Sequence, residues 1–332
     1  MSNIDKSVES SSDYEYSSYP SLSSSDEISS VIYDDPNDDP DFNHPGEPPL
    51  IQLFNKSRIV PNQSIKSYIL LALWAPFGLI IGSLRFVLLF IIAMPLLMIF
   101  SIFNAEPLYW KTVMRAVGFK PRLTGNIPLA KPEEASILVC NHVTDIDAIA
   151  FFGIVPTTGL IELTTRFLRP LVDWAKELGW KVIVVIRETD PAKRHLTREN
   201  LLRVMDSEEG KKRQLFIHGE GATTNGHVGL LRYNKFVFTL NKPVQPLALR
   251  VYPHIPINID CPSRNMFPSL FAFCFCPHVT YEFEPLPVQK RKHSESAEDF
   301  AFRCQKMTAD ALGLCCTTYS YKHKNKLKRV VR

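Results

Sequence analysis

The chain has 332 residues and a formal net charge of +4 at pH 7, but this charge is unevenly spread. Residues 1–48 hold 12 acidic side chains and one Lys, a net charge of −11, so the remainder carries +15. A body this basic favours an anionic membrane surface or phosphate-bearing ligands. The sequence contains no zinc-finger, basic-zipper or RNA-binding aromatic pattern, and we therefore expect no nucleic-acid partner.

Residues 1–48 are rich in serine and proline as well as in acids, and they show almost no aliphatic pattern. Such a segment cannot bury enough apolar surface to offset the entropy that is lost on ordering. We predict a disordered, acidic, serine-rich tail over this range.

Residues 68–103 form an apolar run of 36 residues with one charged side chain, Arg85. One membrane-spanning helix needs about 20 residues and two need about 40. Pro76 and Gly82 lie in its first half, where a helix can bend back. Basic residues flank the run on both sides: Lys56, Arg58 and Lys66 before it, and Lys111, Arg115, Lys120 and Arg122 after it. If positive charge stays cytosolic, both ends lie there, which predicts a membrane hairpin over residues 66–104. A single tilted span is the alternative.

Strands and helices alternate beyond the apolar run. We expect strands at 136–140, 181–186, 213–218, 244–251 and 278–283, and helices at 147–154, 166–178, 191–205 and 298–312. This rhythm predicts an α/β domain over residues 105–320, with a largely parallel sheet flanked by helices. Residues 321–332 are dominated by Lys and Arg, and we interpret them as a basic tail.

The turn after the first expected strand holds the main candidate for chemistry. His142 follows strand 136–140, and Asp147 comes five positions later, where a helix should begin. A carboxylate so placed can hold one tautomer of an imidazole while the other ring nitrogen takes a proton from an alcohol. The structural alternative is a capped helix start, in which Asp145 or Asp147 accepts backbone amides and His142 is a polar surface residue.

Two more loops follow strands at the edge where open α/β sheets gather functional side chains. Arg187 leaves strand 181–186, either as a ligand for an anion or as a simple surface charge. The other loop follows strand 213–218 and combines backbone freedom with hydrogen-bond donors suited to a phosphate or a carbonyl, although an ordinary polar turn has the same composition. Its residues of interest are Gly219, Glu220, Gly221, Thr223, Thr224 and Asn225.

These loops, in this order behind an apolar segment, resemble the sequence blocks of the glycerolipid and lysophospholipid acyltransferase superfamily over roughly residues 70–313. The first block is His, any four residues, Asp, as in His142 and Asp147. The second ends a strand in Arg, as at Arg187, and the third has a Glu-Gly core, as at Glu220. The fourth places a Pro at a strand entry, as in Pro243-Val244-Gln245-Pro246.

Within that superfamily the chain is most similar to the ancient ubiquitous protein family. The shared stretches are Ala75-Pro76-Phe77-Gly78, Asn141-His142-Val143-Thr144, Thr224-Asn225-Gly226, Gly229-Leu230-Leu231-Arg232 and Val244-Gln245-Pro246-Leu247. The resemblance implies a protein of the endoplasmic reticulum membrane and lipid droplets, on their cytosolic face. Its expected partners are membrane lipids, acyl-CoA and proteins of the ubiquitin pathway.

The superfamily resemblance implies transfer of an acyl group from acyl-CoA to a glycerol- or lysophospholipid hydroxyl, without a metal, a cofactor or a covalent intermediate. His142 would be the general base and Asp147 would fix its imidazole. Arg187 would pair with a phosphate of the acceptor or of CoA. The loop carrying Glu220 and Gly221, with donors from Thr223, Thr224 and Asn225, would position the acceptor.

The chain departs from the family pattern at two points. His218 and Gly219 stand where the third block has Phe and Pro. Family members continue into a ubiquitin-binding CUE domain and a helix that recruits a ubiquitin-conjugating enzyme, whereas this chain ends at Arg332. Either the product is truncated or this form never had those modules. The rival interpretation is a scaffold for lipid droplets and for protein degradation at the endoplasmic reticulum, with the fold but without the chemistry. The loss of Phe and Pro favours this scaffold, whereas the intact pair of His142 and Asp147 favours the enzyme.

Overall fold

A computed structural model describes residues 46–89, 92, 96, 106–154, 158–162, 182–185, 191–208, 210–261 and 267–330. Several predictions from the sequence fall outside these ranges. They are most of the acidic tail, the second half of the hairpin, the helix expected at 166–178, and Arg187.

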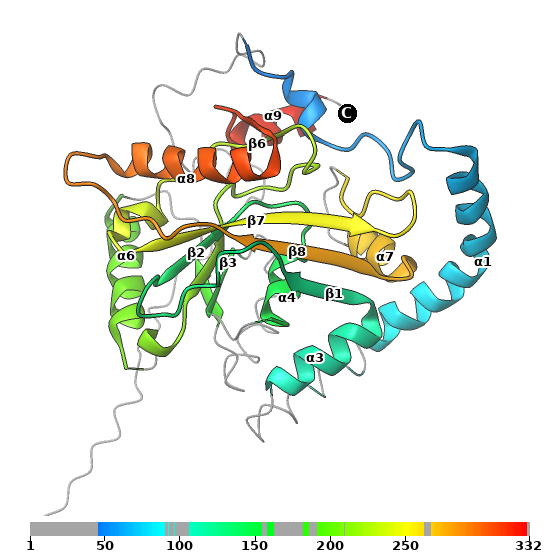
Figure 1. Ribbon diagram of the computed structural model, residues 1–332, viewed down its shortest axis with the longest axis horizontal. Coiled ribbons are helices and arrows are strands. Elements are labelled where there is room, and N and C mark those ends of the chain that lie inside the picture. The colour runs from blue at the N-terminus through cyan, green and yellow to red at the C-terminus, as the bar shows by residue number, and fades with distance from the viewer. Residues whose placement is uncertain are drawn as a thin grey trace, which may run out of the picture.

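A seven-stranded sheet forms the centre of the described chain, in the order β1-β8-β7-β2-β5-β3-β4 (Figure 1). Its strands are β1 (Phe119–Leu123), β2 (Ile137–Cys140), β3 (Thr158–Glu162), β4 (Val182–Val185), β5 (Leu215–His218), β7 (Val244–Pro253) and β8 (Val279–Pro285). Every neighbouring pair is parallel except β7 and β8, which are antiparallel. The largely parallel α/β sheet expected from the sequence is therefore confirmed.

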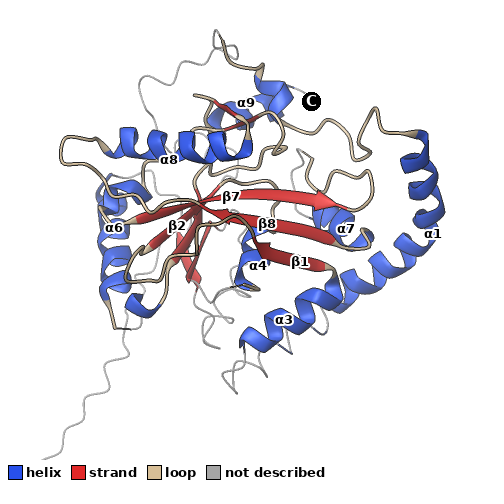
Figure 2. Cartoon of the chain, in the orientation of Figure 1, coloured by secondary structure: helices blue, strands red, loops and turns tan. Residues whose placement is uncertain are grey.

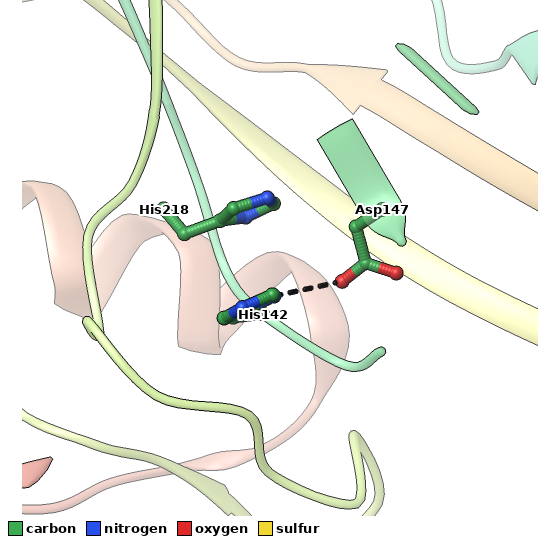
Figure 3. A group of neighbouring side chains, drawn as sticks. All are labelled: His142, Asp147 and His218. Atoms are coloured by element: carbon green, nitrogen blue, oxygen red, sulfur yellow. Dashed lines mark hydrogen bonds and ion pairs between the residues drawn. The ribbon is translucent and has the colours of Figure 1, made fainter. Parts of the chain in front are cut away.

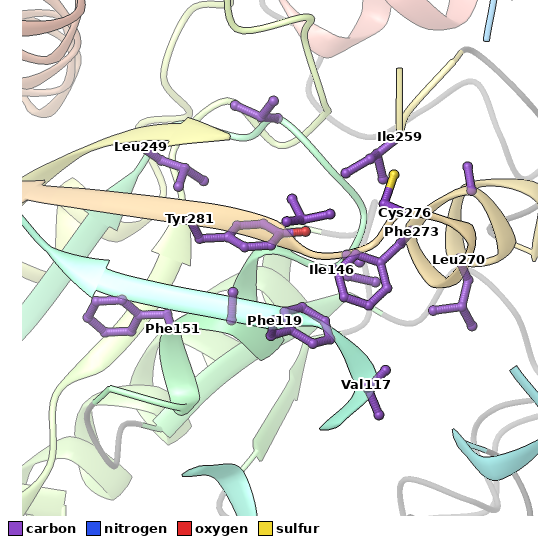
Figure 4. Packing of buried hydrophobic residues seen from close by; sticks show 14 of the residues in the cluster. Val117, Phe119, Ile146, Phe151, Leu249, Ile259, Leu270, Phe273, Cys276 and Tyr281 are labelled. Atoms are coloured by element: carbon purple, nitrogen blue, oxygen red, sulfur yellow. The ribbon is translucent and has the colours of Figure 1, made fainter. Parts of the chain in front are cut away.

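Strand β2 shows why this sheet needs helices on both faces. All four of its side chains are buried, and they alternate between two cores. Leu138 and Cys140 belong to a core with helices α4 (Asp147–Phe152) and α7 (Phe267–Phe275). Figure 4 shows part of this core, with Phe151 of α4 and Phe273 of α7. Ile137 and Val139 point into a second core with helices α6 (Pro191–Asp206) and α8 (Ala297–Leu312). A continuous apolar strand is what burial on two faces requires.

The remaining described elements surround this centre (Figure 2). They are helices α1 (Ile65–Leu88), α3 (Glu106–Val117) and α9 (Tyr321–Val330), a small sheet of β6 (Gly229–Leu230) and β9 (Cys315–Cys316), and the 3-10 helices η1 (Leu50–Leu53), η4 (Gly210–Lys212) and η5 (Val237–Leu240). The range that we interpreted as a basic tail is thus mostly helix α9. Its packed residue Leu327 joins a third core with Leu50, Leu53 and Tyr319.

Helix α1 is the one helix in the described ranges that is long and apolar enough to cross a membrane, judged by length and composition. It continues through Pro76 and Gly82, so the chain does not turn back within residues 65–88. The second limb of the expected hairpin lies outside the described residues, and the hairpin stays a prediction.

One narrow face of α1 packs on α7. Gly78 and Gly82 are its buried residues, and a Cβ at Gly82 would lie 3.0 Å from the Cα of Phe275. The guanidinium of Arg85 donates to the carbonyls of Cys276 (2.7 Å) and Pro277 (3.1 Å), so the single charge of the apolar run is satisfied by the end of α7. The rest of α1 exposes large apolar side chains: Ile65, Ile69, Leu70, Leu73, Phe77, Leu79, Ile80, Leu84 and Val87.

Candidate functional site

The candidate site lies where the parallel strands β2 and β5 end side by side. Cys140 pairs in register with His218, so the turn after β2 and the loop after β5 leave the sheet at the same edge. The structure therefore brings His142, Asp147 and the Glu220 loop together, as the sequence predicted. It adds His218, which the sequence analysis treated only as a departure from the family pattern.

Asp147 holds the imidazole of His142 and the turn around it (Figure 3). Its Oδ2 lies 3.1 Å from His142 Nδ1 and also accepts the backbone amides of Val143 (2.7 Å) and Thr144 (2.9 Å). Its Oδ1 accepts the hydroxyl of Thr144 at 2.5 Å. The carboxylate is fully buried and stands in the first turn of α4. Asp147 thus anchors the turn and is the partner of His142. The structural alternative holds only in part, because the amides that Asp147 accepts precede α4, the helix has no side-chain cap, and the His142 side chain is 17% exposed.

Burial sets the protonation of this pair. It raises the pKa of Asp147 to about 6, against the opposing effect of His218 and of the hydrogen bonds from the turn. Burial lowers the pKa of His142 to about 3, and the positive charge of Lys324 lowers it further. At neutral pH the carboxylate is ionised and the imidazole is neutral. His142 Nδ1–H then donates to Asp147, and its Nε2 keeps a lone pair that can accept a proton.

His218 lies flat against His142. The two ring centroids are 4.0 Å apart with an angle of 10° between the planes (Figure 3). The Nδ1 of His218 lies 3.0 Å from the carbonyl oxygen of Asn141. Burial lowers the pKa of His218 to about 3, and neighbouring His142 adds to that effect, so this ring is also neutral. Only the parallel register of β2 and β5 places the rings together, and sequence spacing does not reveal it.

The donor atoms of His142, Asp147 and His218 lie within 4.8 Å of one another, a spacing that invites comparison with a metal site. The geometry does not fit a shared ion, because an imidazole binds a metal in its own plane and these two planes are stacked. Both oxygens of Asp147 already accept protein hydrogen bonds. The arrangement suits proton transfer rather than coordination.

Glu220, on the loop that follows β5, stabilises the backbone around His142. It is buried, and its two oxygens accept the backbone amides of His142 (2.7 Å) and Leu231 (2.8 Å). Burial raises its pKa to about 8, with these two amides working in the opposite direction. Gly219 is required by a close neighbour, because a Cβ there would lie 2.7 Å from the ring of Tyr233. A Pro at this position would meet the same ring and would lose the bond from Gly219 N to Cys140 O (2.8 Å).

The loop residues that we expected to donate hydrogen bonds to a ligand donate them within the protein instead. These residues are Thr223, Thr224 and Asn225. Thr224 N donates to the carbonyl of His142 at 2.8 Å. Asn225 donates to η1, from its N to Leu53 O and from its Nδ2 to Gln52 O, both at 2.7 Å. The hydroxyl of Thr223 donates to Asp260. The Thr224 bond and the bond from His142 N to Glu220 together hold both the carbonyl and the amide of His142.

Lys324 is a buried residue of the site that sequence reasoning missed. It is 4% exposed on α9, and its Nζ donates to the carbonyl oxygen (2.5 Å) and the hydroxyl (2.6 Å) of Thr223. The ammonium lies 5.0 Å from the ring centre of Phe54. The sequence carried no signal of this burial, because a Lys in a basic segment is ordinarily exposed. Arg187 lies outside the described residues, and its role stays a prediction.

Comparison with known proteins places these features in a family context. No family model matches the chain. It is 29% identical over 278 residues to the lipid droplet-regulating VLDL assembly factor AUP1 of Xenopus tropicalis, covering 82% of this chain and 64% of that protein. It is 28% identical over 212 residues to human lysophosphatidylcholine acyltransferase 2, covering 62% of this chain and 37% of that enzyme. The chain thus spans less than two thirds of either relative.

A solved structure, the 1-acyl-sn-glycerophosphate acyltransferase PlsC of Thermotoga maritima, aligns with a TM-score of 0.48 at 13% identity. The alignment covers 72% of this chain and 97% of that one.

Proposed function

We propose that this chain, which belongs to the ancient ubiquitous protein family within the acyltransferase superfamily, transfers an acyl group from acyl-CoA to a hydroxyl of a glycerol- or lysophospholipid. The observation that carries the proposal is the buried pair of His142 and Asp147. The neutral imidazole is held in one tautomer by an ionised carboxylate at 3.1 Å. That is the arrangement a general base for an alcohol needs.

The proposed reaction is a direct transfer. The acceptor hydroxyl loses its proton to Nε2 of His142 as its oxygen attacks the thioester carbonyl. The tetrahedral intermediate collapses, the carbon–sulfur bond breaks, and the CoA thiolate takes the proton back from His142. Asp147 stabilises the imidazolium that exists between these proton transfers. The products are an ester and free CoA, so neither a metal nor a covalent enzyme intermediate is required.

Two further roles belong to the proposal. Arg187 pairs with a phosphate of the acceptor or of CoA, as a charge-assisted contact. Glu220 and Gly221 shape the loop beside His142, and the backbone of Gly221 adopts a left-handed φ of 65° that favours glycine. Thr223, Thr224 and Asn225 act through this loop, because they bond inside the protein.

Labelled acyl-CoA supplied with a panel of lysolipids to membranes containing the full chain tests this proposal. His142→Ala and Asp147→Ala should each lower acyl transfer at least about 100-fold. The double variant should lose little more, because the two residues act as one unit. His293→Ala, at an exposed position, is the matched control. Transfer that survives in both single variants would place the chemistry elsewhere.

The second candidate is a scaffold of lipid droplets and of protein degradation at the endoplasmic reticulum, with ubiquitin-pathway partners. The use of Thr223 and Asn225 in internal bonds favours it, since a site without turnover needs no free donors. The curated name of the Xenopus relative describes a lipid droplet regulator rather than an enzyme. The same assay decides between the two candidates. If membranes containing the parent protein transfer no more label than membranes of the host alone, the scaffold is favoured.

For either candidate we propose that α1 holds the protein in the endoplasmic reticulum membrane and on lipid droplets, with the folded domain on the cytosolic face. Leu73, Phe77 and Ile80 support this, because all three are exposed and none is needed inside the domain. Replacing the three with Asp in a fluorescent full-length fusion should release it into the cytosol. Val204→Asp, also at an exposed apolar position, is the control. A triple variant that stays on membranes would refute anchoring by α1.

A further inference from the structure

His218 has a nitrogen that is buried without a hydrogen-bond partner. Its Nε2 finds none in the described part of the chain. A buried acceptor left unpaired is costly, so a site that retains one needs an explanation.

The protons of the two stacked rings can be assigned from their partners. A carbonyl oxygen only accepts, so the 3.0 Å contact between His218 and Asn141 O requires a proton on Nδ1 of His218. Because the ring is neutral, its Nε2 carries a lone pair. His142 has the same tautomer, since its Nδ1–H donates to Asp147. The site therefore presents two proton acceptors, one on each imidazole.

These assignments are held firmly in place. The side chain of Asn141 is fully buried and bonds both ways with β7, through Leu249 O at 3.1 Å and Leu249 N at 2.7 Å. This fixes the carbonyl that orients His218. The ring cannot turn over without losing the Asn141 bond, so its free nitrogen keeps one direction.

We propose that His218 binds a second hydroxyl of the acyl acceptor, and that the site selects acceptors with two neighbouring hydroxyls. One hydroxyl meets Nε2 of His142 and is acylated, and the adjacent one donates to Nε2 of His218. This inference rests on the proposed acyl transfer and names its acceptor class. The ring centroids are 4.0 Å apart and a hydrogen bond spans about 3 Å, so one glycerol unit is large enough to bond to both rings. A Phe at this position, as in the family pattern, would keep the ring stack and lack the acceptor.

Matched acceptors that differ by one hydroxyl test the inference. In one pair 1-acylglycerol is compared with 1-acyl-propane-1,2-diol, and in the other glycerol 3-phosphate is compared with its 1-deoxy analogue. We expect the full-length parent in membranes to acylate the two-hydroxyl member of at least one pair about tenfold faster, as kcat/KM. That ratio equals about 1.4 kcal/mol, the scale of one hydrogen bond. A preference within the first pair would indicate an uncharged acceptor, and a preference within the second pair would indicate a phosphate-bearing one.

The variant His218→Phe should bring this ratio to about one, and the control His227→Phe, at an exposed position of the same loop, should leave it unchanged. A purely structural role for His218 would lower both rates together and keep the ratio. An equal rate for both members of each pair in the parent would overturn the inference. A buried water bonded to Nε2 of His218 would then be the remaining explanation for that nitrogen.

A binding measurement separates this inference from the proposed function. Calorimetric titration of the detergent-purified full chain with glycerol 3-phosphate and its 1-deoxy analogue needs no turnover. If no acceptor is acylated, the proposed function fails, yet about tenfold tighter binding of glycerol 3-phosphate in the parent and not in His218→Phe would uphold the second-hydroxyl contact. Equal binding of the two ligands, together with the absence of turnover, would refute both.

Discussion

Lys324→Met tests whether helix α9 holds the loop of the candidate site. The ammonium of Lys324 is buried and gives two hydrogen bonds to Thr223, at 2.5 and 2.6 Å. Bonds from a charged donor contribute about 1.5–3 kcal/mol each. The variant recovers part of this free energy, because it no longer has to bury an ammonium, which costs several kcal/mol. It also leaves the carbonyl of Thr223 without this donor, so we expect a net loss of about 2 kcal/mol in the free energy of unfolding.

For a domain of this size, a loss of about 2 kcal/mol should lower the midpoint of thermal unfolding by about 4–8 °C. Lys326→Met is the matched control, because Lys326 is exposed on the same helix. The removed charge is also one that lowers the pKa of His142, so that pKa should rise in the variant. Thermal unfolding in detergent and NMR titration of the imidazole measure the two effects. Equal midpoints of thermal unfolding for Lys324→Met and Lys326→Met would refute the idea that α9 stabilises the loop.

Three shorter predictions concern other contacts. Gly82→Leu should separate α1 from α7, because a Cβ there meets the α7 backbone at 3.0 Å; faster proteolysis than in the exposed control Ser83→Leu would show it. Gly219→Ala should cost about 1–3 kcal/mol by overpacking on Tyr233, and the added change Tyr233→Leu should recover part of this in thermal unfolding. Burial lowers the pKa of His218 from its usual value of 6.5 to about 3 in the folded protein. Between these values the unfolded chain binds a proton that the folded chain does not, so folding is fully stable in this respect above pH 6.5 and loses free energy as the pH falls toward 3. His218→Phe should therefore lose stability less steeply than the parent in acid unfolding, by about 1.4 kcal/mol per pH unit between about pH 6 and 4.

The fold was predictable where burial leaves a continuous apolar pattern. The run at Ile137–Cys140 is buried on both faces, and its sequence alone indicated a central strand of a parallel sheet. Strand β1 was missed because Phe119–Leu123 contains Pro121 and two basic residues, which is typical of an edge. Helix α9 was missed because His323 and Lys324, two of its buried residues, are of types that usually lie at the surface.

The site was predictable in part for a similar reason. The pair of His142 and Asp147 is local, since five positions separate the residues, and sequence spacing can indicate it. His218 reaches His142 only because β2 and β5 are parallel neighbours with Cys140 and His218 in register. Lys324 reaches the same loop from the other end of the chain. Contacts that depend on strand order cannot be derived from the spacing of a single sequence.

The two residues of the central pair also differ in what they say about catalysis. Asp147 accepts two backbone amides and a hydroxyl in addition to the imidazole, so the turn needs it whether or not the protein performs chemistry. The side chain of His142 is 17% exposed, and its one hydrogen bond to the protein in the described chain is to Asp147. A scaffold that kept only the fold would have a structural use for the carboxylate and little for this imidazole. His142, rather than Asp147, is therefore the residue whose substitution separates an enzyme from a scaffold.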